Sequence, residues 1–262
     1  MDVVYIGGEM FASGERGFIE KEDYYHAIEY GRKKGVKVFF NTPRIIKNMN
    51  DMKVLEFFSP QISRRDGKDL TPGGFLVSNP GVLYYLRSLN STMPIVIDHT
   101  FNIFNRLTME LLSNFSQRVT LSPELTLKEI AQLAHFGPVE CIVHGNFPLM
   151  VSEHDLKGGI FPKSSSRDIC LKDEKGFVFP VRTDMHGRTY ILNSRDLCML
   201  EYVQDLIKAG VNSMRMEART YDARTTEKIT QAYREAIDKS SVNRKCSDLV
   251  EHTTGHYFRG VL

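Results

Sequence analysis

The chain has 262 residues, of which 42% are hydrophobic and 25% are charged, a composition that excludes a mainly disordered protein. Its 34 basic and 32 acidic residues give a formal net charge of +2, which argues against a protein dominated by phosphate binding. No apolar run approaches the roughly 18 residues of a membrane span, and the first residues lack the basic start of a signal peptide. We therefore expect a cytoplasmic protein with no membrane partner.

Short apolar segments alternate with helical patterns along most of the chain. The main expected strands are 3–6, 36–40, 74–78, 94–97, 118–121, 141–143 and 213–216. The expected helices are 20–34, 50–58, 82–89, 106–115, 126–135, 196–209 and 226–239. The alternation breaks at 147–190, where three short strand-like pieces, 169–172, 176–181 and 189–192, predict a β-rich insertion.

Apolar strands that feed amphipathic helices predict a parallel sheet with helices outside it. Seven main strands come close to the eight of a (β/α) barrel, so we expect a TIM-barrel-like α/β fold in one domain, 1–262. An open doubly wound sheet is the alternative. No GxGxxG pattern follows Gly7 and Gly8, which disfavours a dinucleotide site.

The four cysteines are too far apart in the sequence to form a local zinc knuckle. In a cytoplasmic protein all four should be thiols. Cys141 lies in an apolar strand and Cys198 in an expected helix, so both are assigned to the core. Cys170, in the hairpin region, is the most plausible exposed thiol. The fourth is Cys246.

In a barrel of this type, functional residues follow the carboxyl ends of the strands. The catalytic candidates chosen on this basis are His144, Glu124 and Glu217, because imidazole and carboxylate groups can carry protons. The substrate-binding candidates are Asn79, Asn102, Asn105, Arg219, Gly7 and Gly8. The competing interpretation is that polar residues simply cap strands and helices, and that His144 is a structural histidine. Neither a GxSxG elbow nor an HExxH motif occurs.

Short motifs along the chain form an ordered series: VYIGG at 4–8, GVKVF at 35–39, VSNPG at 77–81, NIFN at 102–105, LSPELT at 121–126, VHG at 143–145 with MVSEH at 150–154, YILNSRDLC at 190–198, MEAR at 216–219 and TTGHYFRG at 253–260. Their order and spacing resemble those of the collagenase-like peptidase family U32. The resemblance implies a barrel-like fold and a peptidase, hence hydrolase, assignment. It also implies a further strand and helix before residue 4, so that dimerisation or a partner could complete the barrel.

Relatives in this family also support hydroxylation of transfer RNA, ribosomal RNA or quinone precursors, and carry an iron–sulfur cluster on four cysteines. By resemblance, the four cluster positions fall at Pro148, Asp155, Cys170 and near Gly187. At most Cys170 is retained, and Asp155 and His186 are only weak substitutes for thiolates, so we expect neither an iron–sulfur cluster nor another cofactor.

Three hypotheses follow. The chain is a peptidase-like enzyme that binds a peptide or small molecule at the strand ends, with a reaction that the sequence does not define. Alternatively, it is a cluster-less relative or partner subunit of the hydroxylating branch, working with a cysteine-complete homologue or as a homo-oligomer. The third hypothesis, a non-catalytic substrate- or RNA-binding module, rests on the basic stretches 32–34 and 64–65, which solvated surface explains more simply.

Overall fold

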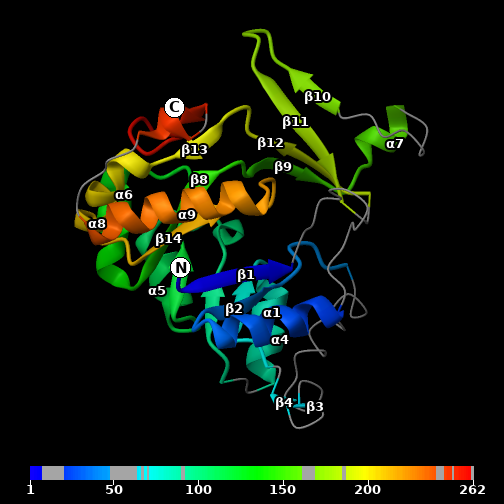
Figure 1. Ribbon diagram of the computed structural model, residues 1–262, viewed down its shortest axis with the longest axis vertical. Helices are drawn as coiled ribbons and strands as arrows, with labels where there is room; N and C mark the ends of the chain where they lie inside the picture. Colours follow the sequence, from blue (N-terminus) through cyan, green and yellow to red (C-terminus); the bar gives the residue numbers. More distant parts are fainter. Residues whose placement is uncertain are drawn as a thin grey trace.

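The computed structural model describes residues 1–7, 21–47, 64–65, 68–69, 71–89, 92–160, 169–184, 187–239, 245–249 and 251–260. A parallel sheet forms its centre (Figure 1). In the described residues, seven strands pair side by side in chain order: β1 (Val3–Gly7), β2 (Lys37–Asn41), β5 (Gly74–Val77), β6 (Ile95–Ile97), β7 (Arg118–Thr120), β8 (Val139–Gly145) and β14 (Ser213–Glu217). This order confirms the TIM-barrel-like α/β class.

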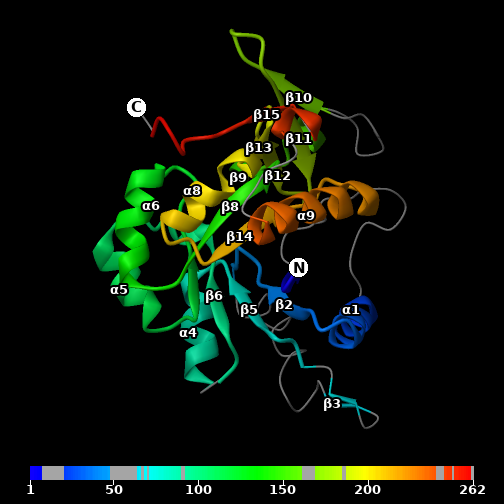
Figure 2. The same ribbon diagram turned by 60° about the vertical axis from the view of Figure 1, so that its left-hand side comes forward.

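Helices cover the outer face of this sheet (Figure 2). They are α1 (Lys21–Lys33), α4 (Pro80–Ser88), α5 (Arg106–Ser113), α6 (Leu127–Leu133), α8 (Val203–Lys208) and α9 (Ala223–Asp238). The core lies between the two layers: β6 is wholly buried, and its Ile95 and Ile97 belong to the same apolar cluster as helix residues such as Met109 and Ile229. Such burial stabilises the layers by roughly 25 cal/mol per Å² of apolar surface.

Polar residues after the strands determine where several helices begin. The side chain of Asn79 accepts a hydrogen bond from Gly81 N and starts α4, and Asn105 accepts one from Thr108 N and starts α5. Thr126 and Glu129 form a capping box on α6. Each cap satisfies backbone N–H groups that the first helical turn leaves without partners.

A second, antiparallel sheet lies within the expected insertion. Its strand order is β10 (Ile169–Lys172), β11 (Val178–Thr183), β12 (Thr189–Leu192) and β9 (Pro148–Ser152), with α7 (Leu156–Ile160) after β9. Figure 1 shows β10 and β11 extending away from the main sheet. The three expected strand pieces are therefore present, whereas β9 was not expected. Short elements elsewhere are β3 (Arg64–Arg65), β4 (Lys68–Asp69), η1 (His99–Phe101) and η2 (Ala134–Phe136).

The prediction of a single helix at 196–209 is wrong. The segment forms a strand, β13 (Asp196–Cys198), then a 3-10 turn, η3 (Leu200–Tyr202), and only then α8. β13 pairs with the end of β8 and with β15 (His252–Thr253), so tertiary pairing overrides the local helical pattern. The helix expected at 50–58 lies outside the described residues.

The expectation of four thiols is also wrong. Cys198 forms a disulfide with Cys246 of η4 (Cys246–Asp248), which ties the carboxyl-terminal segment to β13. Cys141 is a buried thiol and Cys170 an exposed one, as expected. The expectation failed because no sequence signal shows that residues 48 positions apart meet.

The parallel series ends at β1 on one side and at β14 on the other, and no pairing joins these two strands in the described residues. A cavity of about 660 Å³ lies between them, lined by both strands and by α9. Among the described residues, no helix is both long and apolar enough to cross a membrane.

Gly145, at the end of β8, lies where the packing leaves no space for a side chain. Its φ is +111°, and a Cβ there would collide with the backbone oxygen of Glu217. We expect Gly145→Ala to lower the free energy of unfolding by about 3 kcal/mol or more, through backbone strain plus overpacking. Urea denaturation followed by circular dichroism measures this, since the chain has no tryptophan.

Gly35 provides the matched control. Its φ is +68°, but a Cβ there would meet nothing within 4 Å. Gly35→Ala should therefore cost only the strain of the left-handed backbone, about 1–2 kcal/mol. Equal losses in the two variants would contradict the close approach of β8 and β14.

Candidate functional site

The buried guanidinium of Arg215 occupies the centre of the polar interior, in the middle of β14. Its Nη1 lies 2.6 Å from Oδ1 of Asp98, which follows β6, and its Nη2 forms an ion pair with Glu217. The guanidinium also lies over the ring of Tyr5 in β1, 5.5 Å from the ring centroid. One side chain thus connects three of the parallel strands.

Groups from two further strand ends surround Asp98. The Ser78 hydroxyl donates to Oδ2 of Asp98 at 3.0 Å and lies 3.3 Å from Oδ1 of Asn41. His99 Nδ1 lies 2.9 Å from Oδ1 of Asp98. A small pocket of about 20 Å³ is lined by these groups together with Arg44 and Arg219. The carboxyl ends of β2, β5, β6 and β14 therefore do converge.

The charges in this cluster are fixed by their partners. Burial would raise the pKa of Asp98, but His99 and Arg215 hold it well below its ordinary value. Burial would likewise raise the pKa of Glu217, but Arg215 and Arg219 lower it to about 2. Both carboxyl groups are therefore ionised at neutral pH and cannot act as general acids.

A second polar cluster lies deeper, around Glu140 of β8. The Tyr5 hydroxyl and the Ser213 hydroxyl each donate to Oε2 of Glu140 at 2.9 Å. Arg118 pairs with the same oxygen at 3.1 Å, and Thr120 donates to Oε1. Glu140, Ser213 and Arg118 lie at or near the amino ends of their strands, so polar groups occur at both ends of the interior.

His144 lies on the other side of the sheet. It is fully buried, its Nδ1 is 3.3 Å from the Tyr233 hydroxyl of α9, and its Nε2 has no hydrogen-bond partner among the described residues. The hydroxyl already donates to Val143 O, so Nδ1 carries the proton in this contact. Burial, and then the nearby His252, lower the pKa of His144 to about 4. The imidazole is therefore neutral at physiological pH.

A shift in strand register explains this placement. Arg215 is paired with Ile142, but Met216 is paired with His144 and Glu217 with Gly145. Because side chains alternate between faces, a one-residue shift turns His144 towards α9 while Glu217 remains inside. The expectation that His144 and Glu217 share one pocket is thus corrected, and the catalytic roles given to them stay predictions.

The other candidates are distributed over the surface and the cavity wall. Glu217, Arg219 and Gly7 line the large cavity together. Glu124 is exposed, and Asn102 is exposed at a left-handed position, with φ of +52°. Asn79 and Asn105 are helix caps, as the competing interpretation held. Gly8 and His186 lie outside the described residues.

Arg215 and Ser78 are the residues that the sequence alone did not indicate. Arg215 stands between two methionines in an apolar strand, Met214 and Met216, which makes it a charged residue at a buried position. A lone arginine in such a strand signals a buried carboxylate partner, because charges are almost never buried unpaired. Nothing in the sequence identifies that partner.

A model of the family described as Peptidase family U32 matches residues 1–258. The chain belongs to peptidase family U32. It is 25% identical to an uncharacterized protease of Methanocaldococcus jannaschii, over 99% of this chain and 69% of that protein. It is 26% identical to tRNA hydroxylation protein P of Escherichia coli, over 73% of this chain and 54% of that protein. It is 24% identical to tRNA hydroxylation protein P2 of Bacillus subtilis, over 93% of this chain and 84% of that protein.

The residues present do not fit the four-cysteine cluster that the family resemblance implies. The position of Gly187 is next to that of Asp155, since a Cβ on Gly187 would meet the Asp155 carboxylate at 3.7 Å. Two of the implied ligand positions are thus neighbours in space, but neither carries a thiol. Pro148 has no ligating side chain, and Cys170 is exposed on β10. No chemistry is therefore derived from such a cluster.

Stability should depend on pH through His144. Its pKa is about 4 in the folded chain, below the ordinary histidine value of 6.5 expected in the unfolded chain, so the unfolded chain binds more protons between these values. Stability should fall as the pH drops from 6.5 to 4, by at most about 3 kcal/mol from this residue, and level off below. His144→Gln should flatten that part of the profile, measured by urea denaturation at each pH. An unchanged slope would contradict a neutral, buried imidazole.

Replacing Arg215 should destabilise the fold strongly. Arg215→Met leaves the buried carboxylates of Asp98 and Glu217 facing each other without their shared cation, which should cost about 3–5 kcal/mol. The matched control adds Asp98→Asn and Glu217→Gln to the same chain, and should recover part of the loss because neither of these two side chains is then charged. Thermal and urea unfolding measure both. A loss below about 1 kcal/mol in the single variant would show that the ion pairs contribute little.

Proposed function

We propose that the chain binds a phosphate-bearing RNA at the carboxyl ends of its parallel strands and belongs to the hydroxylating branch of family U32. The supporting observation is the charge at this end. Arg44, Arg215 and Arg219 line the small pocket, whereas the carboxylates of Asp98 and Glu217 together supply only two negative charges. The Arg219 side chain is 27% exposed, so a ligand can reach it. Guanidinium groups bind phosphate oxygens in a bidentate manner.

The arrangement of the polar groups does not favour hydrolysis by a serine nucleophile. A catalytic triad needs a histidine between the serine and the acid, so that the imidazole takes the hydroxyl proton. Here Asp98 lies in the middle, with Ser78 on one carboxylate oxygen and His99 on the other. Asp98 is in turn held by Arg215, which reduces its strength as a base.

The names of relatives point in the same direction, since the Escherichia coli and Bacillus subtilis proteins are named for tRNA hydroxylation. The chain covers 54% of the first of these proteins and 84% of the second. On this proposal the chain supplies substrate binding, and a cysteine-complete homologue that acts as its partner supplies the oxidative chemistry. Pull-down of such a homologue with the tagged chain would support the partnership.

Peptide binding is the second candidate. The cavity between β1 and β14 has a volume of about 660 Å³, and Gly7, Glu217 and Arg219 lie on its wall. An extended peptide can add to an exposed strand edge through backbone hydrogen bonds. Glu217 would then be the candidate to act on the peptide, and the names of two relatives, a protease and a collagenase, point to peptide chemistry.

Binding of transfer RNA tests the main proposal. Arg219→Ala should weaken binding about three- to tenfold and lower the slope of log affinity against log salt by about 0.7–0.9, as expected for one lost phosphate contact. Fluorescence anisotropy with labelled tRNA at several salt concentrations measures both quantities. Circular dichroism verifies that the variant is folded.

Lys208→Ala is the matched control, because Lys208 is exposed at the end of α8, which precedes the amino end of β14. It removes the same charge and should leave the salt slope unchanged. Equal effects of the two variants would show nonspecific attraction only. Cleavage of denatured collagen that disappears in Glu217→Gln, with no tRNA binding, would favour the peptide candidate instead.

A further inference from the structure

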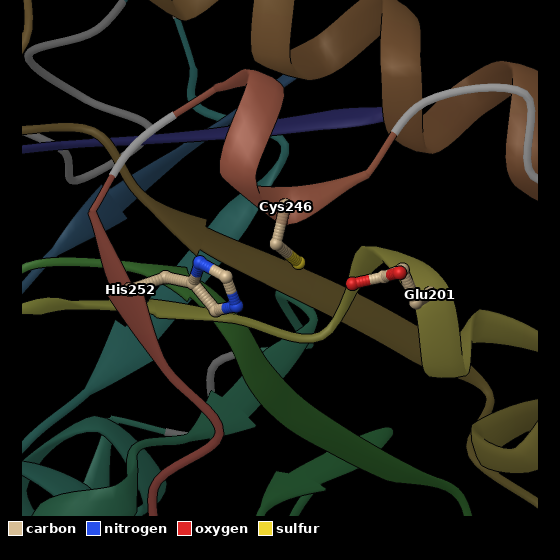
Figure 3. Close-up of side chains that lie close together, drawn as sticks. All are labelled: Glu201, Cys246 and His252. Atoms are coloured by element: carbon tan, nitrogen blue, oxygen red, sulfur yellow. The ribbon is translucent and has the colours of Figure 1, made fainter.

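Three side chains with metal-binding atoms meet near the carboxyl-terminal end of the chain (Figure 3). They are Glu201 of η3, Cys246 of η4 and His252 of β15, and their ligand atoms all lie within 4.8 Å of one another. In Figure 3 the Cys246 sulfur lies between the imidazole of His252 and the carboxylate of Glu201. This cluster, which we call the C-terminal cluster, is separate from the polar interior described above.

The donor atoms of the C-terminal cluster favour one class of metal. A thiolate sulfur, an imidazole nitrogen and a carboxylate oxygen are all accepted by Zn²⁺, whereas Ca²⁺ and Mg²⁺ require oxygen ligands. Zinc–ligand bonds of about 2.0–2.3 Å place neighbouring ligand atoms roughly 3.3–3.8 Å apart in a tetrahedron. Because the ligand atoms lie within 4.8 Å of one another, each pair would have to approach by at most about 1.0–1.5 Å to reach these separations.

The disulfide supplies a fourth ligand once it is reduced. The sulfur of Cys198 is bonded to that of Cys246, so it adjoins the C-terminal cluster, although it is not one of the three ligand atoms that lie within 4.8 Å of one another. Cys198 is itself held by β13, which pairs with β15 at Asp196 and His252. Reduction would turn this pair into two thiols, one at the end of β13 and one at the start of η4.

The surroundings fit a site that a metal can enter. Cys198 and Cys246 are fully buried and His252 is half-buried, but Glu201 is exposed and opens the cluster to solvent. The pattern of a buried sulfur pair, one imidazole and a surface carboxylate matches a tetrahedral site with its carboxylate on the outer side.

We propose that Cys198, Cys246, His252 and Glu201 bind one Zn²⁺ ion when the Cys198–Cys246 disulfide is reduced. A cellular dithiol reduces the bond: two electrons and two protons pass to the cysteine sulfurs, and the dithiol becomes a disulfide. On binding Zn²⁺, the two cysteines release their protons to water and bind as thiolates. The oxidised form links the same elements covalently and cannot bind the ion through these sulfurs. This inference is independent of the proposed RNA binding.

The test uses the full chain in two redox states. One sample is reduced with a phosphine that is then removed without air, and the other is kept oxidised. Each is mixed with ZnCl₂ alone, freed of unbound metal, and analysed for zinc. We expect about one zinc per reduced chain and almost none per oxidised chain. Equal zinc in the two states, or no stoichiometric zinc in the reduced chain, would overturn the proposal.

Variants locate the ion. Cys246→Ser, His252→Ala and Glu201→Gln should each lower the affinity for zinc at least about tenfold. Glu201 is exposed, so its substitution leaves the core intact. Cys170→Ser is the matched control, because Cys170 is the exposed thiol of the separate antiparallel sheet, and it should keep full binding.

Cobalt(II) provides a readout that does not depend on affinity alone. In the reduced chain it should show the visible ligand-field bands of a tetrahedral site and a near-ultraviolet thiolate-to-cobalt band. The thiolate band should weaken in Cys246→Ser and remain in Cys170→Ser. Loss of the band in Cys170→Ser, or unchanged affinity in both Glu201→Gln and His252→Ala, would place the ion elsewhere and refute the site.

Discussion

The ion pairs of Arg215 are the interaction on which the interior of this fold depends. A single buried guanidinium compensates the carboxylates of Asp98 and Glu217 and lies against Tyr5, so it connects β6, β14 and β1. Buried charges are costly unless each has a partner, and the three groups therefore specify one another's positions. The same arrangement keeps both carboxylates ionised, which limits the chemistry that the strand ends can perform.

The two ends of the parallel series give the polar interior its access to solvent. β1 and β14 are not paired with each other in the described residues, and the cavity between them reaches both the Arg215 cluster and Glu140. Strand edges of this kind are normally covered or paired. An unpaired strand edge therefore lies beside a charged interior. The strand edge suits an extended peptide, and the arginines of the interior suit the phosphates of RNA.

The sequence predicts the regular parts of this fold well and the contacts across it poorly. Apolar runs such as 94–97, followed by capped helices, predict the parallel strands, because both signals are local. The rule that polar residues after strands converge places Glu217 and Arg219 correctly on one wall. It fails for His144, because the register shift beside Arg215 depends on how two distant strands pair. The same rule does not indicate Arg215, whose partner Asp98 lies 117 positions away in the sequence.

In the carboxyl-terminal segment, the roles of individual residues depend on contacts with residues far away in the sequence. Taken alone, Cys198 is a small apolar residue in a helical pattern, and Cys246 and His252 have no motif around them. Their roles emerge only when β13 pairs with both β8 and β15, which brings Cys198 opposite His144 and next to Cys246. The buried His144 and the C-terminal cluster then share a wall of the fold. A change of oxidation or metal state at the cysteines would therefore act next to a neutral imidazole whose pKa already responds to the charge of His252.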